Sequence, residues 1–272
     1  MTEHRIVAAT PEPRTRDSLI RDLRHLGVKA GETLLVHCAL SKLGWVSGGA
    51  EAVVRALLGA ITETGTLVMP AQSSQLSDPV HWQAPAVPEN WIEIIRETLP
   101  AFDPLTTPTR DMGAVAELFR TWPGARRSLH PTCSFSALGP SAETITERQL
   151  LAEPFGKDGP LGYLHRSSAR ILLLGAEFDA CTAFHLAEHM AWPSLPRIAE
   201  GSPLIVDGQR RWVNFDIATG DADRFPKIGK ELIRQGLVQT GTVGSATCHL
   251  MSMPEVVDAA ARIMAAQQPP SG

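Results

Sequence analysis

The sequence has few cysteines, and they lie far apart. Cys38, Cys133, Cys181 and Cys248 include no CxxC pair, which argues against a zinc ribbon and against a disulfide-stapled scaffold. We therefore expect a protein of the reducing cytoplasm. The N-terminal residues are polar and interrupted by prolines, without the apolar core of a signal peptide. No run of about 18 apolar residues occurs, so we expect no transmembrane helix.

An excess of basic residues is also lacking. The chain has 25 Lys and Arg against 29 Asp and Glu, a formal net charge of −4. This balance gives no support for a nucleic-acid partner or for binding to an anionic membrane. What the chain does have is 272 residues, 43% of them hydrophobic. That is enough to bury a sizeable core, which excludes a mostly disordered protein.

The pattern of apolar residues predicts an α/β fold with a mixed, largely parallel central sheet flanked by helices. Residues 32–40 and 64–71 are short apolar runs typical of buried strands, and residues 50–61 between them have helical spacing. Strand, helix and strand at this distance form a βαβ unit. Residues 203–217 carry an Asp-Gly turn between two strand-like runs, which predicts a small antiparallel β insertion. Residues 241–251 are predicted to form one strand.

Domain boundaries follow from the same pattern. We expect residues 1–14 to be a flexible N-terminus, residues 15–265 to form a single domain and residues 266–272 to be a disordered tail. Residues 71–112 are rich in Pro, Ser, Thr and Asp and contain one short helical pattern. Such a long connection is expected to be a functional loop or a lid.

The predicted helix at 182–191 places two histidines on one face. His185 and His189 are four residues apart with Glu188 beside them, which matches the HxxEH pattern of a zinc peptidase with Glu188 as general base. No further carboxylate ligand is identifiable. Alternatively, His185 is a metal-free base that accepts a proton from a substrate amine. A purely structural role for both histidines stays open.

A histidine base needs a carboxylate that holds its tautomer. Asp179 lies just before the helix and Asp216 lies on a predicted strand, so either is a candidate beside Glu188. For Asp179 the alternative is a turn or helix-cap aspartate. Cys181, four residues before His185, is a candidate nucleophile or a small buried hydrophobe.

Three further segments are candidate ligand sites. His37 ends a predicted strand, where open parallel sheets bind ligands, unless it is a core histidine. Residues 47–49, Ser-Gly-Gly, open a helix whose free N–H groups favour an anion, or they form a plain turn. Residues 126–131, Arg-Arg-Ser-Leu-His-Pro, suit phosphates or the polar arm of a cofactor, or they are a solvated helix end.

Five segments together resemble the aminoglycoside 3-N-acetyltransferases, the antibiotic N-acetyltransferase family, in order and in spacing. They are LLVHCALSKLGWVSGGAEAVVRAL, GTLVMPA, RRSLHPTCSFSALGPSAE, ILLLGAEFDACTAFHLAEH and GTVGSAT, spread over roughly residues 17–262. The resemblance implies the family's own α/β fold, distinct from that of the GNAT acetyltransferases. It also implies acetyl-CoA as co-substrate and acetylation of the 3-amino group of the 2-deoxystreptamine ring.

The resemblance implies roles residue by residue. His185 matches the catalytic histidine of a T-T-x-H-x-A-E motif, Glu188 matches its glutamate, and His37 falls near acetyl-CoA and the acceptor. Together with Asp179 they are the expected catalytic residues. The residues expected at the cofactor are His37, Ser41, Val46, Ser47, Gly48, Gly49, Arg127, Ser128 and His130. The carboxylates expected to hold a polycationic sugar are Asp78, Asp179, Glu188, Asp216, Asp221 and Asp223.

The sequence departs from the family pattern at four positions. Cys38, Ala39 and Ala183 stand where the family has hydroxyl residues, and Asp216 aligns with a family glutamate. The expected activity is direct transfer without a metal, in a ternary complex, with His185 as base and antibiotic resistance as the consequence. Three alternatives stay open: a CoA-dependent acyltransferase acting on a non-antibiotic amine, a zinc peptidase, and a non-catalytic CoA- or antibiotic-binding protein. Monomer and dimer are both compatible with the sequence.

Overall fold

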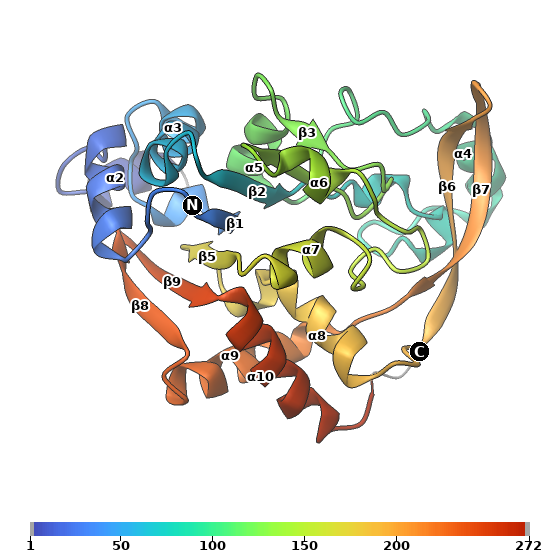
Figure 1. Cartoon of the computed structure of the whole chain (residues 1–272). Coiled ribbons are helices and arrows are strands. Elements are labelled where there is room, and N and C mark those ends of the chain that lie inside the picture. Colours follow the sequence, from blue (N-terminus) through green and yellow to red (C-terminus); the bar gives the residue numbers. More distant parts are fainter. Residues whose placement is uncertain (1–2, 270–272) are drawn as a thin grey trace.

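A seven-stranded mixed sheet forms the centre of the computed structural model, which describes residues 3–269 (Figure 1). The strand order is β3-β4-β2-β1-β5-β9-β8. Strand β1 pairs in parallel with β2 and with β5, and every pair farther out is antiparallel. The bounds are β1 (Thr33–Cys38), β2 (Thr66–Pro70), β3 (Arg126–Arg127), β4 (Phe135–Leu138), β5 (Arg170–Leu174), β8 (Val238–Val243) and β9 (Ala246–Ser252). The predicted mixed α/β class is confirmed, with parallel pairing confined to the three central strands.

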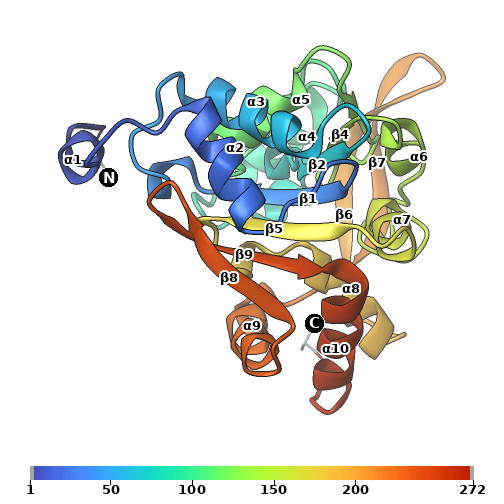
Figure 2. The same cartoon turned by 60° about the vertical axis from the view of Figure 1, so that its left-hand side comes forward.

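Helices cover both faces of this sheet (Figure 2). Successive residues of a strand point to opposite faces, so Leu172 joins the core cluster on one face and Leu173 the cluster on the other. The first cluster packs α2 (Arg16–His25), α3 (Gly49–Ile61) and α5 (Gly113–Arg120) on the sheet. The second packs α6 (Ala142–Thr146), α7 (Pro160–Arg166), α8 (Ala183–Ala191), α9 (Phe225–Arg234) and α10 (Met253–Ala265). Because both faces are covered, the central strands are continuous apolar runs.

A separate two-stranded hairpin confirms the expected antiparallel insertion. Strands β6 (Arg197–Val206) and β7 (Gln209–Ala218) pair along their full length. The turn residues Asp207 and Gly208 both have positive φ, 51° and 76°, as the tight turn predicted from Asp-Gly requires. The hairpin lies beside α4 (Ile92–Thr98) at one edge of the molecule (Figure 1).

Two internal segments differ from the expectation or refine it. Residues 241–251 form parts of two strands, because Gly244 with φ 60° reverses the chain between β8 and β9. Residues 71–112 contain α4 and three short 3-10 helices, and their Phe102 N–H donates to the carbonyl of Pro203 at 2.9 Å. The lid role of this segment stays a prediction.

At the N-terminus, the segment expected to be flexible contains α1 (Glu3–Ala9). The Thr10 hydroxyl accepts from the Trp45 N–H at 2.9 Å, and Arg14 pairs with Val46. Residues 1–2 and the tail residues 270–272 lie outside the described part, and the boundaries at 15 and 265 stay predictions. Within residues 3–269, no helix combines the length and apolarity needed to cross a bilayer.

Removing a core side chain tests the packing. Leu35 is 0% exposed in the middle of β1, whereas Leu105 is 76% exposed. We expect Leu35→Ala to lower the free energy of unfolding by about 2–5 kcal/mol, because a cavity remains. Leu105→Ala should change it by less than about 0.5 kcal/mol. Denaturant unfolding of both variants measures this, and equal losses would contradict the assigned core.

Candidate active site

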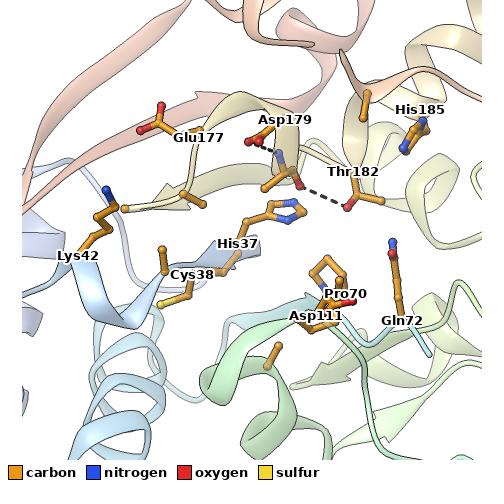
Figure 3. A pocket seen from close by; sticks show the side chains of 18 residues that line it. His37, Cys38, Lys42, Pro70, Gln72, Asp111, Glu177, Asp179, Thr182 and His185 are labelled. Carbon is orange, nitrogen blue, oxygen red and sulfur yellow. Dashed lines mark hydrogen bonds between the residues drawn. The ribbon is translucent and has the colours of Figure 1, made fainter. Parts of the chain in front are cut away.

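A cavity of about 550 Å³ opens at the carboxyl ends of β1, β2 and β5 (Figure 3). Its lining comes from elements far apart in the chain: His37 from β1, Gln72 from the segment after β2, Glu177 from the loop after β5, and Thr182 and His185 from the start of α8. The carboxyl ends of parallel strands are where open α/β sheets bind ligands. A volume of this size suits a small-molecule site.

His185 is held by a buried carboxylate. Its Nδ1 lies 2.6 Å from Glu188 Oε2, one helical turn along α8. Glu188 is 1% exposed, and its Oε1 accepts from the Asp221 N–H at 2.7 Å. An ionised carboxylate only accepts hydrogen bonds, so Nδ1 of His185 is the donor. In the neutral ring the proton-accepting nitrogen is then Nε2, on a side chain that lines the cavity.

Two aromatic rings fix the plane of this imidazole. Phe155 stacks on His185 with ring centres 4.8 Å apart and planes 16° apart. Phe225, at the start of α9, meets the ring at 4.9 Å and 64°. The apolar body of the imidazole is thus packed on two sides. Its polar edge is directed by Glu188.

Gly220 closes the space over the His185–Glu188 pair. A Cβ atom at residue 220 would overlap Glu188 Oε2 and lie 2.6 Å from His185 Nδ1. Real Cβ atoms essentially never approach so closely. A side chain at residue 220 would therefore force Glu188 or His185 to shift, and glycine leaves room for the pair.

His37 supplies a second imidazole at the cavity. It is 7% exposed, and its buried Nε2 has no hydrogen-bond partner among the described residues. Burial lowers the pKa of His37 to about 4. The ring is therefore neutral at physiological pH, with one N–H donor and one acceptor nitrogen.

The three carboxylates expected to orient His185 lie at different distances from it. Asp179 lines the cavity but is exposed, and its Oδ1 accepts from the N–H of Ala180 at 2.9 Å (Figure 3). Asp216 is exposed on β7. Of the three, Glu188 is the one that hydrogen-bonds to His185 among the described residues, and the catalytic roles of the three stay predictions.

Most of the other expected substrate carboxylates have partners within the protein. Asp78 is buried and binds Arg96 at 2.7 Å, and Asp221 binds Arg224 at 2.8 Å. Asp223 is exposed and does not line the cavity. Of the expected set, Asp179 lines the cavity. Glu188 does not line it, but it hydrogen-bonds to His185, which does.

The residues expected at the cofactor mostly lie outside the cavity. Ser41 is exposed beside Lys42, which does line it. Val46 is 7% exposed and pairs with Arg14. Ser47, Gly48 and Gly49 form the turn before α3, and the Gly49 N–H is taken by the carbonyl of Val46. Within this set, His37 is the member that lines the cavity.

Arg127, Ser128 and His130 are buried inside the protein and do not line the cavity, and their expected role as cofactor ligands stays a prediction. Arg127 donates to two backbone carbonyls and two serine hydroxyls. Its pKa is lowered to about 10 by burial. Ser128 and His130 are 0% exposed and hydrogen-bonded. The polar composition of this motif suggested a ligand site, but these side chains form hydrogen bonds within the protein interior.

Several cavity residues escaped the sequence analysis. Gln72 and Glu177 follow β2 and β5, so their positions after strand ends were an available signal. No sequence pattern marks Asp111, which also lines the cavity. Phe155 and Gly220 reach His185 only through tertiary packing, and no local pattern marks them.

The zinc and thiol alternatives receive no support from the geometry. Residues 3–269 contain no group of three or more His, Cys, Asp or Glu side chains placed to share a metal ion. Glu188 is already bonded to His185 rather than free to act on a metal-bound water. Cys181 is 0% exposed, and burial raises its pKa to about 12, so it stays a neutral thiol.

Comparison with known proteins gives a consistent result. The family model for aminoglycoside 3-N-acetyltransferases matches residues 35–265. A prophage-derived aminoglycoside N(3′)-acetyltransferase-like protein of Bacillus subtilis, YokD, is 45% identical over 93% of both chains. Its crystal structure superimposes with a TM-score of 0.93 over 96% of each chain. Aminoglycoside N(3)-acetyltransferase VII of Streptomyces paromomycinus is 35% identical over 95% of this chain and 94% of its own.

A solved complex of a further relative contains the free thiol form of coenzyme A. The enzyme AAC-IIIb with CoASH is 29% identical, with a TM-score of 0.84 over 96% of this chain and 100% of that one. The expected family fold is confirmed by these structural matches. The matches span nearly the whole chain in both sequence and structure. This chain belongs to the aminoglycoside 3-N-acetyltransferase family.

Proposed function

We propose that this protein transfers the acetyl group of acetyl-CoA directly to the 3-amino group of the 2-deoxystreptamine ring of aminoglycosides. The observation that carries the proposal is the buried His185–Glu188 hydrogen bond at the edge of the cavity. Family membership supports the reaction class, and the AAC-IIIb complex supports a CoA-type co-substrate. Antibiotic resistance is the proposed biological consequence.

His185 acts as the general base. At neutral pH the acceptor amine is largely an ammonium, which has no lone pair for attack. Nε2 of His185 removes a proton, and the resulting imidazolium is stabilised by Glu188 on Nδ1. The amine nitrogen then forms the C–N bond, the C–S bond breaks, and CoA leaves as its thiol. One proton is released to solvent for each ammonium acetylated.

His37 is the proposed partner for the thioester oxygen. It lines the same cavity and has an unpartnered buried nitrogen. Its lowered pKa keeps the ring neutral, so it donates a single N–H without competing for the substrate proton. A preorganised donor of this kind stabilises the developing oxyanion by a few kcal/mol.

The charges around the cavity suit the two substrates. Lys42 is the cationic side chain in the lining and is available to an anionic group of CoA. Asp111, Glu177 and Asp179 give the lining an acidic character that attracts a polycationic sugar. All four cysteines are free, and we propose a cytoplasmic enzyme that works as a monomer or a dimer.

The departures from the family pattern bear on the acceptor. Cys38 and Ala39 line the cavity where the family has hydroxyl residues, while Ala183 is fully buried. Burial raises the pKa of Cys38 to about 12, so it contributes a neutral thiol. Thr182 retains a hydroxyl in the lining. These changes favour testing a non-antibiotic amine as the second candidate acceptor.

Replacing the base tests the mechanism. In an assay of thiol release from acetyl-CoA with gentamicin, kanamycin and apramycin, we expect His185→Ala to lower kcat by about 10²–10⁴-fold. Glu188→Gln should also lower it, because the amide no longer stabilises the imidazolium. CoA binding should persist in both variants.

The matched control is His189→Ala, which removes the other histidine of the HxxEH segment on the same helix. We expect near-native turnover from it. Loss of activity in His189→Ala, together with a requirement for zinc, would instead favour a metallopeptidase-like site. Native protein that binds CoA but acetylates none of the three antibiotics would redirect the search to other amines.

Gly220→Ala tests how tightly the pair is packed. The added methyl must shift Glu188 or His185, so we expect kcat to fall by about 10²-fold while KM for acetyl-CoA changes little. Gly159→Ala is the control, because its nearest contact would be an ordinary 3.6 Å. A native kcat in Gly220→Ala would contradict the assigned geometry.

A further inference from the structure

The segment 127–131, Arg-Ser-Leu-His-Pro, is buried except for Leu129, and it leads by hydrogen bonds to the loop that carries Phe155. We propose that this segment is a positioning device for His185: Ser128, His130 and Gln149 anchor residues 149–155 so that Phe155 stays stacked on the imidazole. The inference rests on the proposed role of His185 as base. It assigns a function to a motif whose side chains lie outside the cavity.

The first link runs from Ser128 to Gln149. The Ser128 hydroxyl donates to Gln149 Oε1 at 2.6 Å and accepts from the Phe135 N–H at 2.9 Å. Ser128 is 0% exposed, so neither bond competes with water. The hydroxyl acts as donor to the loop and as acceptor from strand β4, and it thereby links the two.

The second link runs through the amide of Gln149. Its nitrogen donates to the carbonyl of Cys133 at 2.8 Å and to the carbonyl of Pro154 at 2.9 Å. Pro154 immediately precedes Phe155. One side chain therefore ties the buried motif to the backbone next to the stacking ring, with each amide hydrogen directed to a defined acceptor.

His130 gives a second anchor to the same loop. Its Nδ1 accepts from the N–H groups of Thr132 and Cys133 at 3.2 and 3.0 Å, which places the ring proton on Nε2. Nε2 then donates to the carbonyl of Leu151 at 3.2 Å. Burial lowers the pKa of His130 to about 4, so this neutral tautomer persists through the physiological range.

The loop delivers Phe155 between two rings. One neighbour is His185, stacked at 4.8 Å, and the other is Phe135, met edge-on at 6.3 Å and 89°. The carbonyl of Ala152 also accepts from the N–H of Ala218 at 3.0 Å. Residue 218 lies two positions before Gly220. The anchored loop and the segment 218–221 thus enclose the His185–Glu188 pair from two sides.

This arrangement predicts effects that a cofactor site would not produce. Loosening the loop frees the imidazole plane of His185 but leaves the other cavity-lining residues in place, so kcat falls while KM for acetyl-CoA holds. Loss of a cofactor ligand would raise KM instead. The ring current of Phe155 also marks the stacked His185, so the ring protons of His185 report the geometry without any substrate.

Gln149→Met tests the proposal, because methionine has a similar shape and removes all three hydrogen bonds of a half-buried side chain. We expect kcat to fall by about 10- to 100-fold with KM for acetyl-CoA within about twofold. Phe155→Leu should lower kcat in the same way, whereas Phe155→Tyr, which keeps an aromatic ring, should retain most of the native kcat. The control is Gln235→Met, the same substitution at an exposed residue directly after the end of α9.

Proton NMR of the folded variants without substrate supplies the second readout, with the His185 resonances identified by their loss in His185→Gln. In native protein and in Gln235→Met these protons should be shifted upfield by stacking, and in Gln149→Met they should move toward ordinary values. Unmoved resonances, or a raised KM with native kcat, would overturn the proposal. Absence of turnover by the native protein would overturn the proposed function alone, since the NMR comparison does not depend on it.

Discussion

The hydrogen bond between His185 and Glu188 is the interaction on which the rest of the site depends. A carboxylate that is 1% exposed is costly to bury unless its oxygens are bonded. Here one oxygen binds the imidazole and the other binds the Asp221 N–H. Breaking the pair would leave a buried charge with half its partners. The same bond that defines the base is therefore also a constraint on folding, and it sets one tautomer of His185.

The residues around this bond restrict the position of the His185 ring and of the Glu188 carboxylate. Gly220 allows the chain to cross directly over the pair, and Phe155 and Phe225 hold the imidazole plane. Strand β1 brings His37 to the same cavity that His185 lines (Figure 3). Rigid strands and a helix position both imidazoles, as preorganised catalysis requires.

Sequence patterns predicted the parts of this structure that have a local cause. Short apolar runs located β1 and β2, helical spacing located α3, and the Asp207-Gly208 pair located the turn of the β6–β7 hairpin. The helical spacing of His185 and Glu188 placed both on one face of α8. The strand pair β8 and β9 was predicted as one strand, because a two-residue turn at Gly244 is too short to interrupt the apolar pattern.

What sequence could not show is burial of polar residues and contact across the fold. Arg127, Ser128 and His130 have the composition of a ligand site, yet their partners are backbone carbonyls and side chains brought together by tertiary structure. Gly220 and Phe155 lie far along the chain from His185 and have ordinary neighbours in sequence. Their importance follows only from the distances in the folded protein.

The most direct test of this account is the tautomer of His185, measured by nitrogen-15 NMR of the imidazole at a pH where the ring is neutral. The geometry predicts a protonated Nδ1, bonded to Glu188, and an unprotonated Nε2 that is ready to accept a proton. Observation of the Nε2–H tautomer would contradict it, because the nitrogen on the cavity side would then have no lone pair for the substrate amine.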